Sequence, residues 1–317
     1  MNYPYVCTRV RARKGQLLKD DDYRKLVTLR STADILAYLG KGPYQSDLVE
    51  IPGRLDNLEL LHMATFRNYG RSAMEVYRMT ADGFKGELYP LFMKLDMLNM
   101  LTVLRGKYGE LTRQELEHLL VPAPTIKPRL LMNMYDSDSH SILRSFGQNL
   151  LLGGINPDMS HREIENRIYF NWLLMLKRLE KVKILKNFIQ ETLFVYDLMN
   201  LVKARVYGAP LNEFVSGRTT TFLKYQHQED LFRAIQQTFD LGGVEPHELE
   251  NQLETRLLRK GLRLMRMNPI SAGPVVGFLQ AKELEARNLR VIGFGVETGM
   301  SPADIRGELI HESGRGG

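Results

Sequence analysis

Residues 268–292, NPISAGPVVGFLQAKELEARNLRVI, carry the pattern from which the fold follows. Asn268 can cap a helix that has Pro269 at its first position. Small residues then recur every four positions on one helical face: Gly273, Gly277 and Ala281. Each glycine in a helix costs about 1 kcal/mol relative to alanine. We therefore expect this face to be buried against another helix of the same chain, at close backbone approach.

The same stretch contains an acidic residue three positions before an asparagine, and this pair occurs three times. The pairs are Asp96 and Asn99, Asp197 and Asn200, and Glu285 and Asn288. Upstream of each pair lies an aliphatic–acid–asparagine tripeptide: Leu55-Asp56-Asn57, Ile164-Glu165-Asn166 and Leu249-Glu250-Asn251. Two motifs that recur together in the same order indicate a tandem triplication. The alternative is coincidence, since acid–asparagine pairs are common on helical surfaces.

The triplication predicts three similar helical-bundle domains in a pseudo-threefold arrangement that can enclose a central hollow. The expected domains are residues 1–110, 111–217 and 218–317. A period of about 100 residues is too long for a solenoid repeat. We interpret the acid–asparagine pairs as structural, with the asparagine satisfying backbone groups and the acid pairing with a neighbouring domain.

Helix signals dominate the chain and predict an all-α fold. Four capping-box-like starts are present: Ser31 with Asp34, Thr112 with Glu115, Ser160 with Glu163, and Ser301 with Asp304. Apolar residues recur at helical spacing in residues 54–80, 84–105, 160–207, 218–240 and 269–292, and no stretch alternates with period two. We expect loops at residues 40–53 and 121–128.

The composition is that of a globular protein, with 44% hydrophobic and 25% charged residues and a net charge of +6. The single cysteine, Cys7, excludes an internal disulfide. No apolar run is long enough to span a bilayer, and the N-terminus has no apolar signal core. Arg9, Arg11 and Arg13 form a basic cluster. Its alternatives are a solvated helix face or a contact with an acidic protein or lipid head groups.

No residue set predicts catalysis, a cofactor or a metal. The pairs Glu115/His118 and Glu308/His311 supply only half of a di-iron bundle site. Residues 291–299, VIGFGVETG, imitate a dinucleotide-binding loop, but their third glycine is one residue late, so we interpret them as an ordinary loop. A phosphate-binding loop and a nucleophile with its base are also missing from the sequence.

Several blocks together resemble the C-type stalk proteins of archaeal-type and V-type rotary ATPases, whose eukaryotic counterpart is the d-type protein of the V-ATPase. At the C-terminal end the resemblance lies in NPISAGPVVGFL (268–279), in Ala281-Lys282-Glu283, Glu285 and residues 287–290, and in GMSPADIR (299–306). It also covers YPYV (3–6), RVRA (9–12) and Leu17-Leu18 at the start, and DMLN (96–99) with LRGK (104–107) in the middle. The second repeat departs from this pattern, because Arg205 follows Asn200 by five residues whereas Arg105 follows Asn99 by six.

This resemblance implies a funnel-shaped, purely helical subunit that performs no chemistry. Its implied partners are the proteolipid ring subunits of the membrane sector and the central shaft subunits, at the cytoplasmic face of the membrane. It would transmit torque for ATP-linked proton or sodium transport, and its acid–asparagine pairs could then contact the shaft directly. Two other classes remain alternatives: a helical adaptor that binds nucleic acid or acidic proteins through basic faces, and a bundle metalloenzyme.

Overall fold

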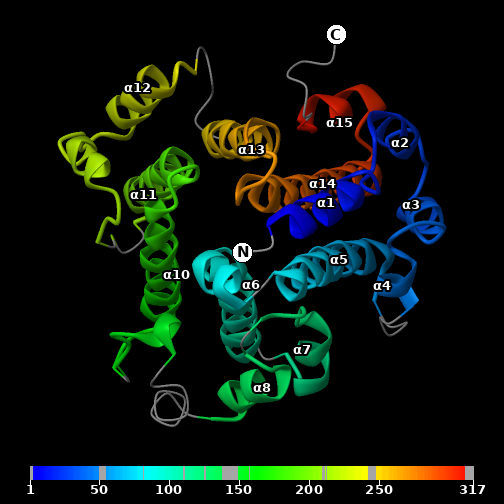
Figure 1. Cartoon of the computed structure of the whole chain (residues 1–317), viewed down its shortest axis with the longest axis horizontal. Coiled ribbons are helices and arrows are strands. Elements are labelled where there is room, and N and C mark those ends of the chain that lie inside the picture. Colours follow the sequence, from blue (N-terminus) through cyan, green and yellow to red (C-terminus); the bar gives the residue numbers. More distant parts are fainter. Residues whose placement is uncertain are drawn as a thin grey trace.

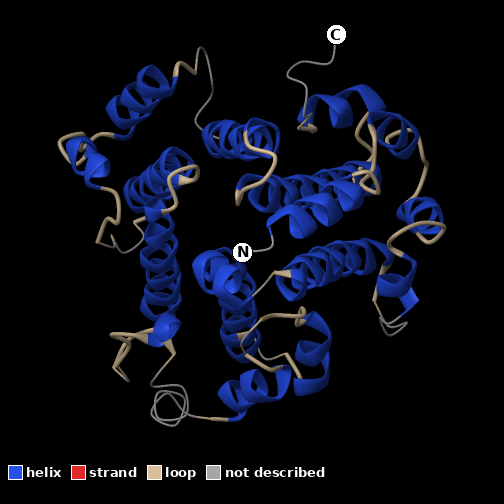
Figure 2. Ribbon diagram, in the orientation of Figure 1, coloured by secondary structure: helices blue, strands red, loops and turns tan. Residues whose placement is uncertain are grey.

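The computed structural model describes residues 3–49, 55–80, 82–109, 111–124, 126–137, 149–156, 158–208, 211, 213–241 and 248–310. Within these residues the chain is all-α, as predicted, and no strand is present (Figure 2). No described helix is both long enough and apolar enough to cross a membrane.

Six long helices form a closed ring (Figure 1). In chain order they are α5 (Asn57–Met79), α6 (Asp82–Tyr108), α10 (His161–Lys177), α11 (Lys186–Tyr207), α13 (Leu249–Met267) and α14 (Gly273–Glu297). Each packs against the next, and α14 packs back against α5. Neighbours run antiparallel: Arg105 near the end of α6, for example, pairs with Glu165 near the start of α10 at 3.0 Å. The turns that join α5 to α6, α10 to α11 and α13 to α14 therefore lie at the same end of the ring.

Shorter elements surround this ring. They are α1 (Tyr3–Lys14), α2 (Asp20–Leu26), α3 (Thr32–Leu39), α4 (Gln45–Val49), α7 (Arg113–Leu119), α8 (Pro128–Asp136), α12 (Gln228–Phe239), α15 (Pro302–Glu308) and the 3₁₀ turns η1 (Leu150–Leu152), η2 (Arg178–Lys181) and η3 (Gly217–Phe222). Helix α1 lies between α14 and α5 (Figure 1). The others pack outside the ring, so that α7 and α8 contact α6, α12 contacts α11, and α3 and α15 contact α14.

The apolar core crosses the limits between the repeats. Its largest cluster contains residues of α5, α6, α10, α11, α13 and α14, so all six ring helices share one core. A second cluster joins α11, α12 and α13, and a third joins α2, α3, α5, α14 and α15. The proposed domain limits near residues 110 and 217, and the funnel shape, stay predictions.

All four expected helix caps are present. The side-chain oxygens of Ser31, Thr112, Ser160 and Ser301 each accept a hydrogen bond from the backbone N–H three residues later. The carboxylates of Glu115 and Glu163 complete two of these capping boxes by accepting from the backbone of the cap residue. These four capping-box starts were therefore predicted correctly.

Two predictions around the last long helix are wrong. Helix α14 begins at Gly273 rather than Pro269, and Asn268 instead ends α13 in an extended conformation. The reason is local: Ser271 Oγ accepts from Gly273 N–H at 3.0 Å, and Pro274 occupies the first turn. Residues 291–297 are helical, not a loop, because Gly293 and Gly295 let α14 pack closely against Leu61 and Ile305.

Other boundaries also differ from the sequence-based expectation. The apolar stretch 160–207 forms two helices, α10 and α11, with a turn between them. Helix α13, which a turn joins to α14, was not among the stretches in which we expected apolar residues at helical spacing. Part of the expected loop 40–53 is helical, since α4 spans Gln45–Val49 and buries Asp47 against Asn68 and Arg71.

The predicted glycine face lies where α13 crosses α14. A methyl group added at Gly277 would lie 2.6 Å from Met265 Cβ and 3.2 Å from the carbonyl oxygen of Gly261. One added at Gly273 would lie 2.5 Å from the carbonyl oxygen of Leu264. Ala281 is buried one turn further on. The crossing thus brings the two backbones together, with no room for side chains on this face of α14.

We predict that Gly277→Leu lowers the free energy of unfolding of the isolated chain by about 1–3 kcal/mol or more through overpacking. Gly277→Ala should be milder but still destabilising, because its methyl group would displace Met265. The matched control is Gly86→Ala in α6, where an added methyl group meets open space. This control should gain about 0.4–1 kcal/mol. Chemical denaturation of the three variants checks the order, and an unchanged stability of Gly277→Leu would assign this face to a partner instead.

Candidate functional site

Two of the three repeated asparagines make the same pair of buried hydrogen bonds. Asn99 donates from Nδ2 to the carbonyl oxygen of Val121 at 2.8 Å and accepts from Val121 N–H at 2.9 Å. Asn288 makes the corresponding bonds with Ile310, at 2.9 and 3.1 Å. In both cases the partner lies 22 residues later, just beyond a short capped helix. Each amide therefore fastens the chain that leaves its short helix back onto a ring helix.

The acid of each pair also accepts backbone N–H groups. Asp96 accepts from Ile126 at 3.0 Å, and Asp197 accepts from Ser216 at 2.6 Å. The second copy nevertheless differs, because Asn200 is only half-buried and makes no such pair of bonds within the described residues. The sequence irregularity after Asn200 coincides with this structural departure.

In the third copy, Glu285 joins the two ends of the chain. Its carboxylate accepts from Leu18 N–H at 2.6 Å, from the Tyr44 hydroxyl at 2.6 Å and from the Lys282 ammonium group. Tyr44, Lys282 and Glu285 are all at most 3% exposed. Buried beside this carboxylate, the Tyr44 hydroxyl has a pKa well above its ordinary value. This set of contacts, which we call the Glu285 clasp, ties residues 18–44 to α14.

All six ring helices line a central cavity of about 150 Å³. Its wall includes Tyr69 (α5), Trp172 (α10), Tyr196 (α11) and Val276 (α14), together with charged side chains of α6, α13 and α14. About 10–15 Å³ of such volume is enough for one water molecule. The cavity therefore has room for several waters beside its charged side chains.

Two ion pairs cross this cavity. Lys94 of α6 pairs with Glu283 of α14 at 2.5 Å, and Arg287 of α14 pairs with Glu254 of α13 at 2.6 Å. Burial disfavours the charged ammonium, but the Glu283 carboxylate outweighs it and holds the pKa of Lys94 well above its ordinary value. Burial raises the pKa of Glu254 despite the nearby Arg287. Lys94 and Glu283 therefore link helices of the first and third repeats directly.

The basic N-terminal residues have separate roles. The Arg13 guanidinium pairs with Glu75 of α5, and Arg11 donates to the carbonyl oxygen of Pro269 at 3.1 Å. Arg9 is exposed. The three arginines therefore do not form a single basic cluster, because Arg13 already pairs with Glu75 of the same chain.

The described part of the chain brings together no metal-ligating group. Among these residues, no set of three or more His, Cys, Asp or Glu side chains could hold a metal ion. Glu115 caps its own helix, and His311 lies outside the described residues. Sequence reasoning missed Tyr44, Lys94, Glu254 and Glu283. A helical-face analysis of the long helices, looking for charged residues among apolar ones, could have indicated Lys94, Glu254 and Glu283; Tyr44 lies in a turn and gives no such signal.

Comparison with known proteins now decides the family. A family model described as "ATP synthase (C/AC39) subunit" matches residues 6–308. The chain belongs to this ATP synthase (C/AC39) family. Its relatives include the C subunits of the A-type ATP synthases from Haloferax volcanii, Methanosarcina barkeri and Archaeoglobus fulgidus, which are 27%, 25% and 21% identical. The alignments cover 97–98% of this chain and 93–97% of each relative.

Membership of the C/AC39 family confirms the resemblance that the sequence blocks indicated. The chain is accordingly a subunit of the rotary ATPase class, related to archaeal A-type proteins over nearly its whole length.

We predict that Asn99→Ala and Asn288→Ala each lower the free energy of unfolding by about 1–3 kcal/mol, because each leaves a buried N–H and C=O unpaired. Asn200→Ala is the matched control and should cost clearly less. Chemical denaturation of the three variants measures the ranking. An equal cost at all three positions would contradict the conclusion that Asn99 and Asn288 make this pair of buried hydrogen bonds and Asn200 does not.

The stability that Asp197, the acid of the second pair, gives to the fold should depend on pH. Burial raises the pKa of Asp197 to about 6, against about 3.9 in an unfolded chain. The folded chain therefore binds the Asp197 proton more tightly than the unfolded chain does. The resulting contribution of Asp197 to the free energy of unfolding is full below about pH 4 and is lost as pH rises through about 6. Denaturation over this range should show the stability of the wild type falling relative to Asp197→Asn. A difference that is constant with pH would contradict the raised pKa.

Proposed function

We propose that this chain is a non-catalytic central-stalk component of an A-type/V-type rotary ATPase. It would lie between the rotor shaft and the proteolipid ring, at the cytoplasmic face of the membrane. There it would pass torque between them during ATP-linked proton or sodium transport. The observation that carries the proposal is a closed helix ring in a member of the C/AC39 family.

The packing suits a part that must turn without deforming. Ion pairs span the contact between α6 and α10, the contact between α11 and α13, and the central cavity: Arg105–Glu165, Lys203–Glu250 and Lys94–Glu283. One apolar cluster continues through all six ring helices. A torque applied at one end would therefore load several helices at once rather than bend a single one.

The pocket at the centre of the ring limits where a shaft could bind. We propose that the shaft end binds around the axis of the ring, where all six helices contribute side chains. The buried acid–asparagine pairs then serve the fold and do not touch the shaft, since Asp96, Asn99, Glu285 and Asn288 are at most 2% exposed.

Affinity capture of the tagged full-length chain from native membranes tests the proposal. We expect the ATP-handling head, the shaft and the proteolipid subunits to co-purify, as identified by mass spectrometry. Gly86→Ala should capture the same set and serves as the folded control. Capture of soluble nucleic-acid-binding proteins in place of these subunits would contradict the proposal and favour the adaptor.

A further inference from the structure

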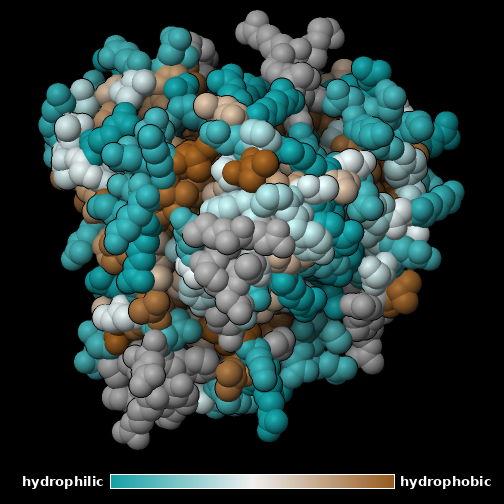
Figure 3. All heavy atoms as spheres, viewed as in Figure 1, coloured by the Kyte–Doolittle hydropathy of each residue, from teal (hydrophilic) through white to brown (hydrophobic). Residues whose placement is uncertain are grey.

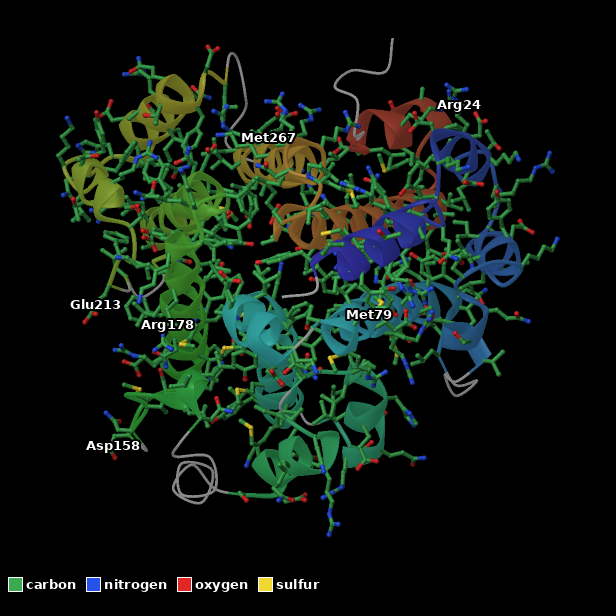
Figure 4. The ribbon with its side chains drawn as sticks, viewed as in Figure 1. Arg24, Met79, Asp158, Arg178, Glu213 and Met267 are labelled. Carbon is green, nitrogen blue, oxygen red and sulfur yellow. The ribbon has the colours of Figure 1, made fainter. Side chains whose placement is uncertain are left out.

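Two segments far apart in the sequence form one surface at the turn between α13 and α14. Arg11 of α1 donates to the carbonyl oxygen of Pro269, and Cys7 Sγ donates to the carbonyl oxygen of Ser271 at 3.3 Å. These bonds hold the middle of α1 beside the turn that follows α13. This surface lies at the end of the ring where the turns between α5 and α6, α10 and α11, and α13 and α14 are found, which we call the hairpin-turn end. The buried bonds of Asn99 and Asn288 lie toward the opposite end. Figure 4 labels Met267, the last residue of α13.

The two segments carry basic side chains and no acid: residues 3–19 and 255–282 include no Asp or Glu. Arg9, Arg11 and Arg263 are exposed. Arg266 is exposed too, but it interacts within the chain and lies in one pocket with Asp20, so we do not assign it to this surface. Arg13, Arg256 and Lys260 do not belong to this surface, because they pair with Glu75 and Glu191 inside the chain.

Large apolar side chains stand exposed among these arginines. Met267 is 68% exposed, Ile270 is 63% exposed and Tyr5 is 50% exposed. On the face shown in Figure 3, hydrophobic residues emerge among hydrophilic ones near the end of α13. Apolar residues that project from a basic surface are typical of protein segments that lie in the head-group region of a membrane.

We propose that Tyr5, Arg9, Arg11, Arg263, Met267 and Ile270 form a docking surface for anionic lipid head groups. The proposal rests on the proposed function, since it assigns the hairpin-turn end of the ring to the membrane side. The arginines would pair with lipid phosphates while Met267 and Ile270 enter the boundary with the acyl chains. An acidic protein surface would use the arginines as well, but it would not account for two adjacent, exposed aliphatic side chains.

Co-sedimentation of the purified full-length chain with vesicles tests this docking surface. The vesicles contain either phosphatidylcholine alone or equal parts of phosphatidylcholine and phosphatidylglycerol. We expect binding to the anionic vesicles that weakens with salt, because it depends on charge. Replacing Arg9, Arg11 and Arg263 with Gln, or Met267 and Ile270 with Ser, should each weaken that binding by about tenfold or more.

The matched control replaces three exposed basic residues elsewhere, Arg30, Lys41 and Arg129, with Gln. It removes the same charge and should retain most of the binding. Absence of vesicle binding, or equal loss in this control, would overturn the proposal. Loss with the arginine variant but not with the Met267/Ile270 variant would also overturn it, in favour of an acidic protein partner. Because the vesicles contain no other subunit, failure here leaves the result of the membrane capture unaffected.

Discussion

The Glu285 carboxylate fastens the N-terminal segment to the last long helix, beside the contact that closes the ring. Five of the six contacts around the ring join helices that follow one another in the chain, whereas the contact between α14 and α5 joins its two ends. Beside this contact, Glu285 holds the segment that precedes α5, since it accepts from Leu18 and Tyr44 and from Lys282 of α14 itself. A buried ion pair that loses one partner costs about 3–5 kcal/mol. The attachment of residues 18–44 to α14 therefore depends on a complete set of polar partners, whereas the contact between α14 and α5 is apolar.

The three acid–asparagine pairs solve one physical problem in related ways. A chain that leaves a helix in a buried position must satisfy its backbone N–H and C=O groups. Asn99 and Asn288 do so with two bonds each, and Asp96 and Asp197 accept further N–H groups. Glu285 makes a different contact, because it accepts from Leu18 and Tyr44 and so holds the N-terminal segment. The pairs thus position the outer elements on the ring and leave its centre to other residues.

The sequence predicted the features that depend on local chemistry. Helix caps, the all-α fold and the family followed from residues such as Ser160, Thr112 and the block 268–279. The start of α14 was missed because Asn268 and Pro269 match a helix start, while Ser271 and Pro274 determine the observed one. The ion pairs Lys94–Glu283 and Arg287–Glu254 could not be predicted, because their partners meet only when the ring closes. Contacts between distant repeats carry no signal in local spacing.

Native-state hydrogen exchange on the isolated full-length chain tests the central claim, that the ring behaves as one mechanical unit and that the Glu285 clasp holds the N-terminal segment on it. We predict that buried amides of α5, α10, α13 and α14 exchange through a single cooperative opening with one common free energy. In Glu285→Gln, amides of α2, α3 and α15 should exchange at a lower free energy than those of α10 and α11. Separate openings of each repeat in the wild type, with no selective change in Glu285→Gln, would contradict the account.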